Sequence, residues 1–405
     1  MRNNARAILF TVFLSIIVLG NFPSMQADAA PQKTSNNVQP VVIGVPLPLS
    51  GDLQPFGVMM KNSLEMAKVA INSEGGIKGR PLELVYADDR GKSSEGEKGI
   101  TRLVKDSKVI MLVGGYASTP TYAMARRANE LDIPFLICTA SADKITQMGW
   151  RNIYRVNPPV SEYTKGLEDF WVKNYKPKSM AIIYEDGLYG SSGARAMMEY
   201  CVDRAIEIQA LVPYTRETSS SVYFRSILAP LTREPPDVIY MVSYLQDGVA
   251  LVRTIRELNV KSLACGGAGG FTLPEFINMA GDSASNLVTA TLWSSQLPYP
   301  GAREYFDRYV EMYSSPPDYH GTEAYSALFV AADALKRATS HRPKDIRAAL
   351  NQTFMMTPFG PVKFYTYEDF ERQNSVRTQV LQIINRQFEV IWPLDLATAK
   401  FVPPF

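Results

Sequence analysis

Few side chains in this sequence stand at spacings that support catalysis. Ser141-Ala142-Asp143-Lys144 has the S-x-x-K spacing of a serine nucleophile with a lysine base, but neither S-D-N nor K-T-G follows it, as that mechanism requires. His320 and His341 are the two histidines, without cysteine or carboxylate at metal-ligand spacing, so a zinc site is not expected. Phosphate-binding and dinucleotide-binding glycine motifs are absent from the sequence. These features favour a binding protein over an enzyme, with no cofactor and no metal.

Apolar strand-like runs alternate with helical stretches over most of the chain, and they would position any site. Residues 41–49 form a buried apolar run that ends in Pro, Ser and Gly before a helix begins near Phe56, which is typical of a parallel strand with a ligand loop at its carboxyl end. Repeated crossovers predict an α/β fold with mainly parallel sheets covered on both faces. The expected strands are 41–49, 82–88, 109–113, 134–138, 180–184, 206–212, 238–242 and 262–265, followed by a hairpin of 380–384 and 388–392; the expected helices are 56–74, 93–106, 119–131, 161–175, 191–205, 222–233, 246–258, 302–313, 321–339 and 343–350.

The first 29 residues are expected to be a secretory signal peptide. Arg2 and Arg6 precede a short apolar core, and Ala27-Asp28-Ala29 supplies the small residues of a cleavage site. Without this leader, 40 basic residues (42 less Arg2 and Arg6) face 39 acidic ones (40 less Asp28), a formal charge of +1. This balance gives no reason to expect nucleic acid or an anionic membrane as partner. The mature protein is expected in the periplasm, or secreted.

The three cysteines, Cys138, Cys201 and Cys265, cannot all pair. One disulfide is compatible with an oxidising compartment, whereas small buried thiols are the simpler interpretation. The mature chain is longer than a single hydrophobic core usually supports, so two domains are expected. Two sheets joined by several chain crossings would leave a cleft that can close about a hinge.

Several segments, in this order, resemble the periplasmic leucine/isoleucine/valine-binding protein family. They are VVIGVPLPLSG, INSEGGIKGRPLELVYADD, LVGGYAST, CTASADKIT, NIYRVNPP, AIIYEDGLYGSSG and TPFGPVKF, and they extend over most of the chain after the leader. The resemblance implies a type I periplasmic binding protein fold, with an N-terminal lobe of residues 41–157 and 290–361 and a C-terminal lobe of 158–289 and 362–396. It also implies a monomeric substrate-binding protein that delivers a small molecule to the membrane permease subunits of an ABC importer.

The family's ligand site maps onto loops of both lobes. In the first lobe, the resemblance places Ser118 at a helix start, where free N–H groups favour a carboxylate. Hydroxyl and backbone donors would come from a neighbouring loop, and aromatic walls from both lobes. The implied ligand-binding residues are Phe56, Tyr116, Ala117, Ser118, Thr139, Ala140, Ser141, Tyr189, Tyr244 and Gly267.

One position departs from the family pattern. The amino-acid binders have an acidic residue for the ligand ammonium where this chain has Gly267, and a buried ammonium without a partner is costly. Asp186 or Asp247 could substitute from a nearby loop. The ligand is therefore expected to be a branched-chain amino acid or related carboxylate, with an aromatic or aliphatic carboxylate or amide lacking an ammonium as the alternative. A ligand sensor is a further alternative.

Overall fold

The computed structural model describes residues 38–404, so the expected signal peptide lies outside the described residues. All elements below belong to one unit of the chain, Gln39–Phe405. The first seven-stranded sheet has the order β13-β14-β5-β4-β3-β1-β2. Its strands are β1 (Val41–Leu47), β2 (Leu82–Asp88), β3 (Met111–Gly114), β4 (Phe135–Ile137), β5 (Ile153–Arg155), β13 (Tyr365–Tyr367) and β14 (Phe370–Gln373).

The second seven-stranded sheet has the order β16-β15-β10-β9-β8-β6-β7. Its strands are β6 (Ser179–Glu185), β7 (Glu207–Tyr214), β8 (Val238–Val242), β9 (Leu263–Gly266), β10 (Val288–Thr291), β15 (Gln379–Ile384) and β16 (Gln387–Trp392). The strands β6 to β10 pair in parallel, whereas β15 and β16 form the expected antiparallel hairpin. Asn385 and Arg386 connect this hairpin, both with positive φ, as a two-residue turn requires.

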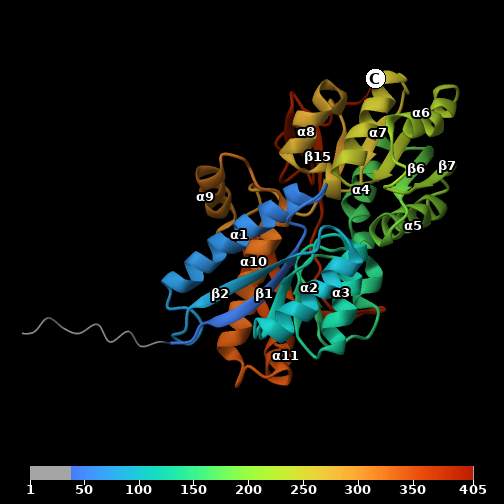
Figure 1. Cartoon of the computed structure of the whole chain (residues 1–405). Helices are drawn as coiled ribbons and strands as arrows, with labels where there is room; N and C mark the ends of the chain where they lie inside the picture. The colour runs from blue at the N-terminus through green and yellow to red at the C-terminus, as the bar shows by residue number, and fades with distance from the viewer. Residues whose placement is uncertain (1–37, 405) are drawn as a thin grey trace, which may run out of the picture. The chain divides into compact units, whose positions relative to one another are not determined.

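Helices cover both sheets, and α1 and α10 lie side by side in the first lobe (Figure 1). The helices are α1 (Gln54–Ser73), α2 (Ser93–Asp106), α3 (Ser118–Glu130), α4 (Thr164–Phe170), α5 (Leu188–Asp203), α6 (Ser221–Leu228), α7 (Leu245–Glu257), α8 (Pro274–Ala280), α9 (Ala302–Tyr313), α10 (Tyr319–Arg337) and α11 (Pro343–Asn351). A small hairpin of β11 (Phe354–Thr357) and β12 (Gly360–Lys363) follows α11. Two α/β lobes, each with a largely parallel sheet, confirm the predicted fold class.

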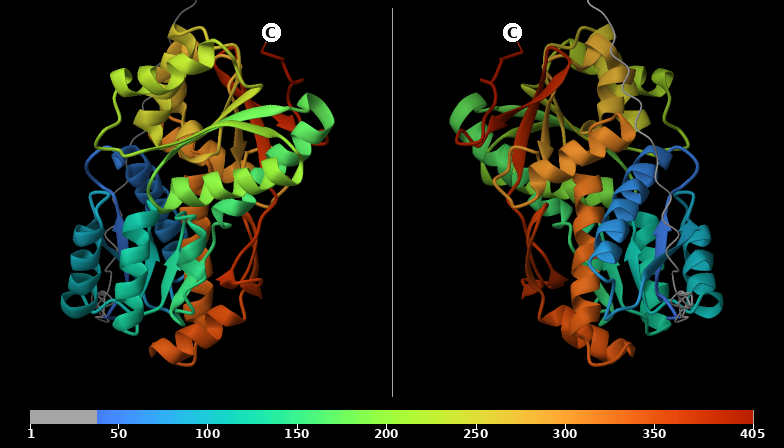
Figure 2. Two further views of the ribbon diagram at one scale, coloured as in Figure 1. Left: turned by 90° about the vertical axis from the view of Figure 1, so that its right-hand side faces the viewer. Right: turned by 90° about the vertical axis from the view of Figure 1, so that its left-hand side faces the viewer.

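The chain passes between the two sheets three times, after β5, after β10 and after β14. The third passage lies later than the sequence placed it. The strand β14 pairs with β5 through Gln373 and Arg155, so residues 365–373 belong with the first sheet and not with the C-terminal lobe that was expected to resume at 362. Similarly, β10 pairs with β9 and β15, so the C-terminal lobe extends past 289. Figure 2 shows the red C-terminal strands in both halves of the described unit.

Within residues 38–404, no helix is long and apolar enough to cross a membrane. Cys138, Cys201 and Cys265 are free, buried thiols, which is the simpler of the two interpretations of the sequence. Burial alone raises the pKa of the Cys201 thiol to about 11, so it stays protonated at neutral pH.

Candidate functional site

The first-lobe part of the site consists of two loops that Ser118 joins. Ser118 begins α3, directly after β3, and its side chain is buried. Its Oγ accepts hydrogen bonds from the backbone N–H groups of Ser141 at 3.2 Å and Ala142 at 3.0 Å, on the loop after β4. A hydroxyl has two acceptor lone pairs and one donor. Because both lone pairs are used, the Ser118 hydroxyl can act only as a donor toward any further group.

The neighbouring positions are held by the same loops. Thr139 is buried and its hydroxyl donates to the Gly115 carbonyl at 3.1 Å. The Ala140 carbonyl accepts from a buried arginine, and Ala117 is the extended residue that precedes α3. The hydroxyl and the backbone N–H of Thr139 and the carbonyl of Ala140 are therefore bonded within the protein, and the part of these residues in ligand binding stays a prediction.

Aromatic rings from both lobes meet beside these loops and form what we call the aromatic cluster: Phe56, Tyr116, Tyr189, Tyr244, Tyr319 and His320. Phe56 stacks on Tyr116 with ring centroids 4.5 Å apart, and Tyr116 lies 6.1 Å from Tyr244 of the other lobe. Tyr244 in turn lies 5.4 Å from Tyr189. The Tyr116 hydroxyl is buried and has no hydrogen-bond partner among the described residues, so it is free to bond a ligand.

Four members of this region were not predicted from the sequence: Asp318, Tyr319, His320 and Thr272. His320 stacks on Tyr319 at 3.8 Å and packs against Phe56 at 4.9 Å. Asp318 caps α10 by accepting from the His320 backbone N–H at 2.9 Å, and it also bonds His320 Nδ1 at 2.8 Å. The sequence placed the start of α10 at 321, which left Asp318, Tyr319 and His320 in the preceding loop. Asp318, an aspartate just before this helical segment, is an N-cap signal that could have located the true start of the helix.

Hydrogen bonds join the lobes around the aromatic cluster. The Gly269 backbone N–H donates to the Tyr319 hydroxyl at 3.1 Å, and the Thr272 hydroxyl donates to Asp318 Oδ2 at 2.7 Å. At the other side, the Leu188 backbone N–H donates to Thr119 Oγ1 at 3.1 Å. The predicted residues of the two lobes are thus brought together in one place, and their role in ligand binding stays a prediction.

Gly267 lies beneath the aromatic cluster, where its carbonyl accepts from the Tyr189 hydroxyl at 2.9 Å. A Cβ at this position would lie 2.5 Å from the buried Tyr240 hydroxyl oxygen. A longer side chain here would therefore be directed at Tyr240, inside the second lobe. Gly267 itself supplies no carboxylate, and a larger residue here would meet the Tyr240 ring.

Two carboxylates close to the cluster, Asp247 and Glu185, are bonded to the protein, whereas neither oxygen of Glu323, a buried residue of α10 that interacts with Tyr319, has a hydrogen-bond partner among the described residues. Asp247 accepts from the Ser219 hydroxyl at 2.7 Å, and burial raises the pKa of its carboxyl. Glu185 accepts from the backbone N–H groups of Gly187 and Gly190, each at 2.8 Å, at the start of α5. The other proposed substitute, Asp186, is exposed. Arg216 supplies positive charge instead, 5.2 Å from the centre of the Tyr244 ring.

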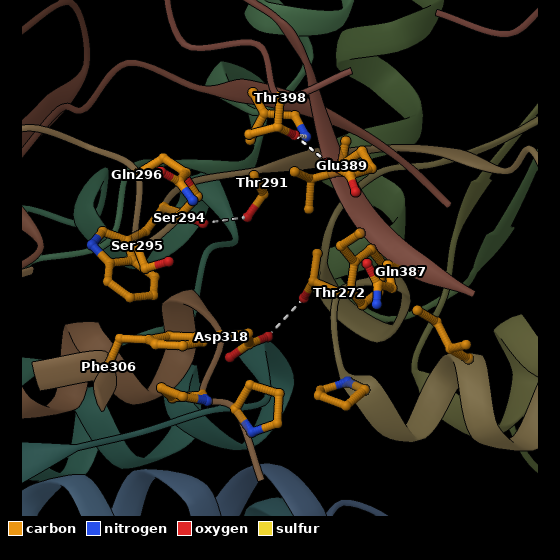
Figure 3. A pocket seen from close by; sticks show the side chains of 18 of the residues that line it. Thr272, Thr291, Ser294, Ser295, Gln296, Phe306, Asp318, Gln387, Glu389 and Thr398 are labelled. Carbon is orange, nitrogen blue, oxygen red and sulfur yellow. Dashed lines mark hydrogen bonds between the residues drawn. The ribbon is translucent and has the colours of Figure 1, made fainter. Parts of the chain in front are cut away.

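A cavity of about 570 Å³ borders the aromatic cluster on the side of α8 and α9. Its lining includes Thr272 and Asp318 but none of the ten predicted residues. Figure 3 shows Thr272 and Asp318 directed at each other, with Ser294, Ser295 and Gln296 on another wall. Both lobes contribute to the walls, because Phe306 comes from α9 and Glu389 from β16. No group of three or more His, Cys, Asp or Glu side chains within residues 38–404 could hold a metal ion.

Comparison with known proteins places this architecture in a family. The profile of the periplasmic binding protein family matches residues 40–384, so the chain belongs to that family. It is similar to Leu/Ile/Val-binding protein homolog 7 of Brucella abortus, with 26% identity over 345 residues that cover 81% of this chain and 84% of the relative.

Two solved structures share the fold. One is the branched-chain amino acid transporter substrate binding protein LivJ from Streptococcus pneumoniae in complex with isoleucine, with a TM-score of 0.80, 23% identity, and coverage of 88% of this chain and 100% of that chain. The other is an ABC transporter solute binding protein from R. palustris in complex with benzoate, with a TM-score of 0.76, 20% identity, and coverage of 87% and 95%.

Proposed function

We propose that this protein is the periplasmic substrate-binding component of an ABC importer and that it binds a small organic carboxylate between its lobes. The observation that carries the proposal is the position of Ser118. Its hydroxyl is left only a donor role, and it lies at the start of a 13-residue helix, where the dipole favours an anion. The rings of Phe56, Tyr116 and Tyr244 lie beside it and would enclose the apolar part of the ligand.

The surrounding charges favour a carboxylate that lacks an ammonium group. Gly267 offers no carboxylate, and Asp247, Glu185 and Asp318 are already bonded to the protein. The buried Glu323 carboxyl has no hydrogen-bond partner among the described residues, but burial raises its pKa and so disfavours the charged form that an ammonium would need. Aromatic rings would stack on a flat ligand with about 0.5–1.5 kcal/mol per pair beyond burial. The benzoate complex of one structural neighbour and the isoleucine complex of another mark the two ligand classes to be compared.

Ligand contacts made only in the closed arrangement would shift the equilibrium toward it. The closed form would then be recognised by the membrane permease subunits of the importer. We expect a monomer that binds its ligand without turnover. A sensor would use the same cleft, and binding studies with isolated permease subunits separate the two functions.

A thermal-shift screen of the mature chain, from Ala30 onward, tests the proposal. The panel contains leucine, isoleucine, valine, benzoate, 4-hydroxybenzoate and isovalerate, each with its primary amide. A ligand that binds the folded protein raises its melting temperature by linkage. We expect shifts with the ammonium-free acids that exceed those with the amides. Melting-temperature shifts confined to leucine, isoleucine and valine would show that the ligand is a branched-chain amino acid. A protein stabilised by no member of the panel would contradict the proposal.

A further inference from the structure

Arg155, at the end of β5, is a fully buried arginine whose hydrogen bonds all go to neutral groups. Its Nη1 donates to the carbonyls of Ala140 at 3.2 Å and Ala142 at 2.7 Å. Its Nε donates to Gln373 Oε1 at 2.6 Å and its Nη2 to Thr146 Oγ1 at 2.8 Å. Burying a cation without a contacting anion is costly, so the position calls for a physical explanation.

The carboxylates around Arg155 form no ion pair with it among residues 38–404. Asp143 lies 3.7 Å from Arg195 of the other lobe and accepts from the Ser161 backbone N–H at 3.2 Å. Glu162 accepts from the hydroxyls of Tyr367 and Ser375, each at 2.7 Å. Burial raises the pKa of the Glu323 carboxyl well above its usual range, and neither of its oxygens hydrogen-bonds Arg155 or any other described residue. The positive charge of Arg155 is thus only distantly compensated by the protein.

The two carbonyls that Arg155 holds flank Ser141, on the loop that faces Ser118. In a trans peptide the C=O and the N–H point in opposite directions. The Ala140 carbonyl is turned toward Arg155, and the N–H of the same peptide, on Ser141, reaches Ser118 Oγ. A chain of hydrogen bonds therefore runs from the guanidinium through this peptide to the Ser118 hydroxyl, and such chains polarise in one direction.

We propose that Arg155 is a positioning residue for the carboxylate of the ligand: from behind the loop, its charge and its fork of donors make the Ser118 end of the cleft selective for an anion. The inference rests on the proposed function and adds the residue that sets its charge preference. Arg155 touches no ligand itself in this arrangement. It acts through the 140–142 backbone, and its delocalised charge stays in place because guanidinium groups do not lose their proton at neutral pH.

The test compares an acid with its uncharged amide, since a purely structural residue would affect both alike. Dissociation constants for benzoate and benzamide, and for isovalerate and isovaleramide, are measured by titration calorimetry on the mature chain. In Arg155→Met we expect the affinity for the acids to fall about tenfold or more, with the amides changed by about threefold or less. Arg155→Lys should keep a preference for the acids. Equal losses for acid and amide would overturn the proposal.

Two further variants keep the test decisive if Arg155→Met does not fold. Asp143→Asn keeps an acceptor for the Ser161 N–H and removes a negative charge near Arg155, so the ratio of acid to amide affinity should rise. An unchanged or lower ratio would overturn the proposal. Arg372→Met is the matched control, because Arg372 also donates to two carbonyls, of Ile153 and Trp150, away from Ser118. A wild-type protein that binds none of these compounds would refute the proposed function, and the inference with it.

Discussion

Replacement of Ser118 by alanine tests the construction of the first-lobe loops most directly. In the wild type, the Ser118 hydroxyl oxygen accepts from the N–H groups of Ser141 and Ala142, and Ser118 is 2% exposed. Alanine would leave both buried N–H groups without their acceptor, and each such loss costs about 1–3 kcal/mol. Allowing for partial relaxation of the loop, we expect the free energy of unfolding to fall by about 2–4 kcal/mol.

The same substitution removes the donor that we assign to the ligand carboxylate. A hydrogen bond to a charged group contributes about 1.5–3 kcal/mol, so the dissociation constant should rise about 10- to 150-fold. Urea unfolding, followed by tryptophan fluorescence, measures the stability, and calorimetry with the tightest-binding acid of the panel measures the affinity. Each effect is measured separately, because stability is determined without ligand.

Ser221→Ala provides the matched control. Ser221 is also the first residue of a helix, α6, but it is exposed. Its replacement should change the unfolding free energy by about 0.5 kcal/mol or less and leave the affinity unchanged. If Ser118→Ala and Ser221→Ala unfold at the same urea concentration, the two hydrogen bonds to Ser118 do not hold the loop. If stability falls and affinity does not, Ser118 has a structural role and the carboxylate binds elsewhere.

Three other predictions concern single groups. Burial raises the pKa of Asp89 to about 6 in the folded chain, above the 3.8 of a free carboxyl. The protonated Asp89 side chain is therefore compatible with folding below pH 3.8, and the free energy of unfolding falls as the pH rises through 6 and the buried carboxyl becomes charged. Asp89→Asn should therefore be more stable than the wild type by up to about 3 kcal/mol near neutral pH and similar in stability to it in acid, and urea midpoints at both pH values measure this; a constant difference would contradict the buried carboxyl. Gly267→Ala places a Cβ 2.5 Å from the Tyr240 hydroxyl oxygen and should cost about 1–3 kcal/mol, part of which Tyr240→Phe should restore in a double-mutant cycle; strictly additive effects would argue against the clash. Thr272→Val removes the hydroxyl that donates to Asp318 between the lobes, so ligand should bind about tenfold more weakly by calorimetry, while an unchanged affinity would mean that this bond does not contribute to closure.

The sequence predicted the fold class because the spacing of apolar residues in each strand and in the helix that follows depends on which face is buried locally. It also predicted the hairpin of β15 and β16, since Asn385-Arg386 is a turn with a recognisable composition. The passage of residues 365–373 back to the first sheet was missed. The pairing that decides it, Gln373 with Arg155, joins residues more than 200 positions apart, and periodicity carries no information on such partners.

The candidate site was predictable only where a family motif marks a loop. The motifs located Ser118 and the aromatic residues of both lobes, but not Asp318 and His320. The predicted start of α10 was two residues too late, so Asp318 was not recognised as its N-cap. Nor could the sequence show that Ser118 uses both of its lone pairs on the neighbouring loop. That conclusion depends on two distances between segments 23 and 24 residues apart, and it changes Ser118 from one donor among several into a group with a single remaining role.

The contacts between the lobes bear on how much free energy a ligand must supply. Thr119, Tyr319 and Asp318 each accept a hydrogen bond from the other lobe, and the Tyr116 and Tyr244 rings meet between them. These contacts within the protein thus stabilise the closed state. The ligand needs to supply only the rest of the free-energy difference between the open and the closed state. Weakening these contacts should lower the apparent affinity for acids and amides by the same factor, whereas changes at Arg155 should separate the two classes. Measuring the affinity for an acid and for its amide therefore distinguishes an effect on closure from an effect on the preference for a charged ligand.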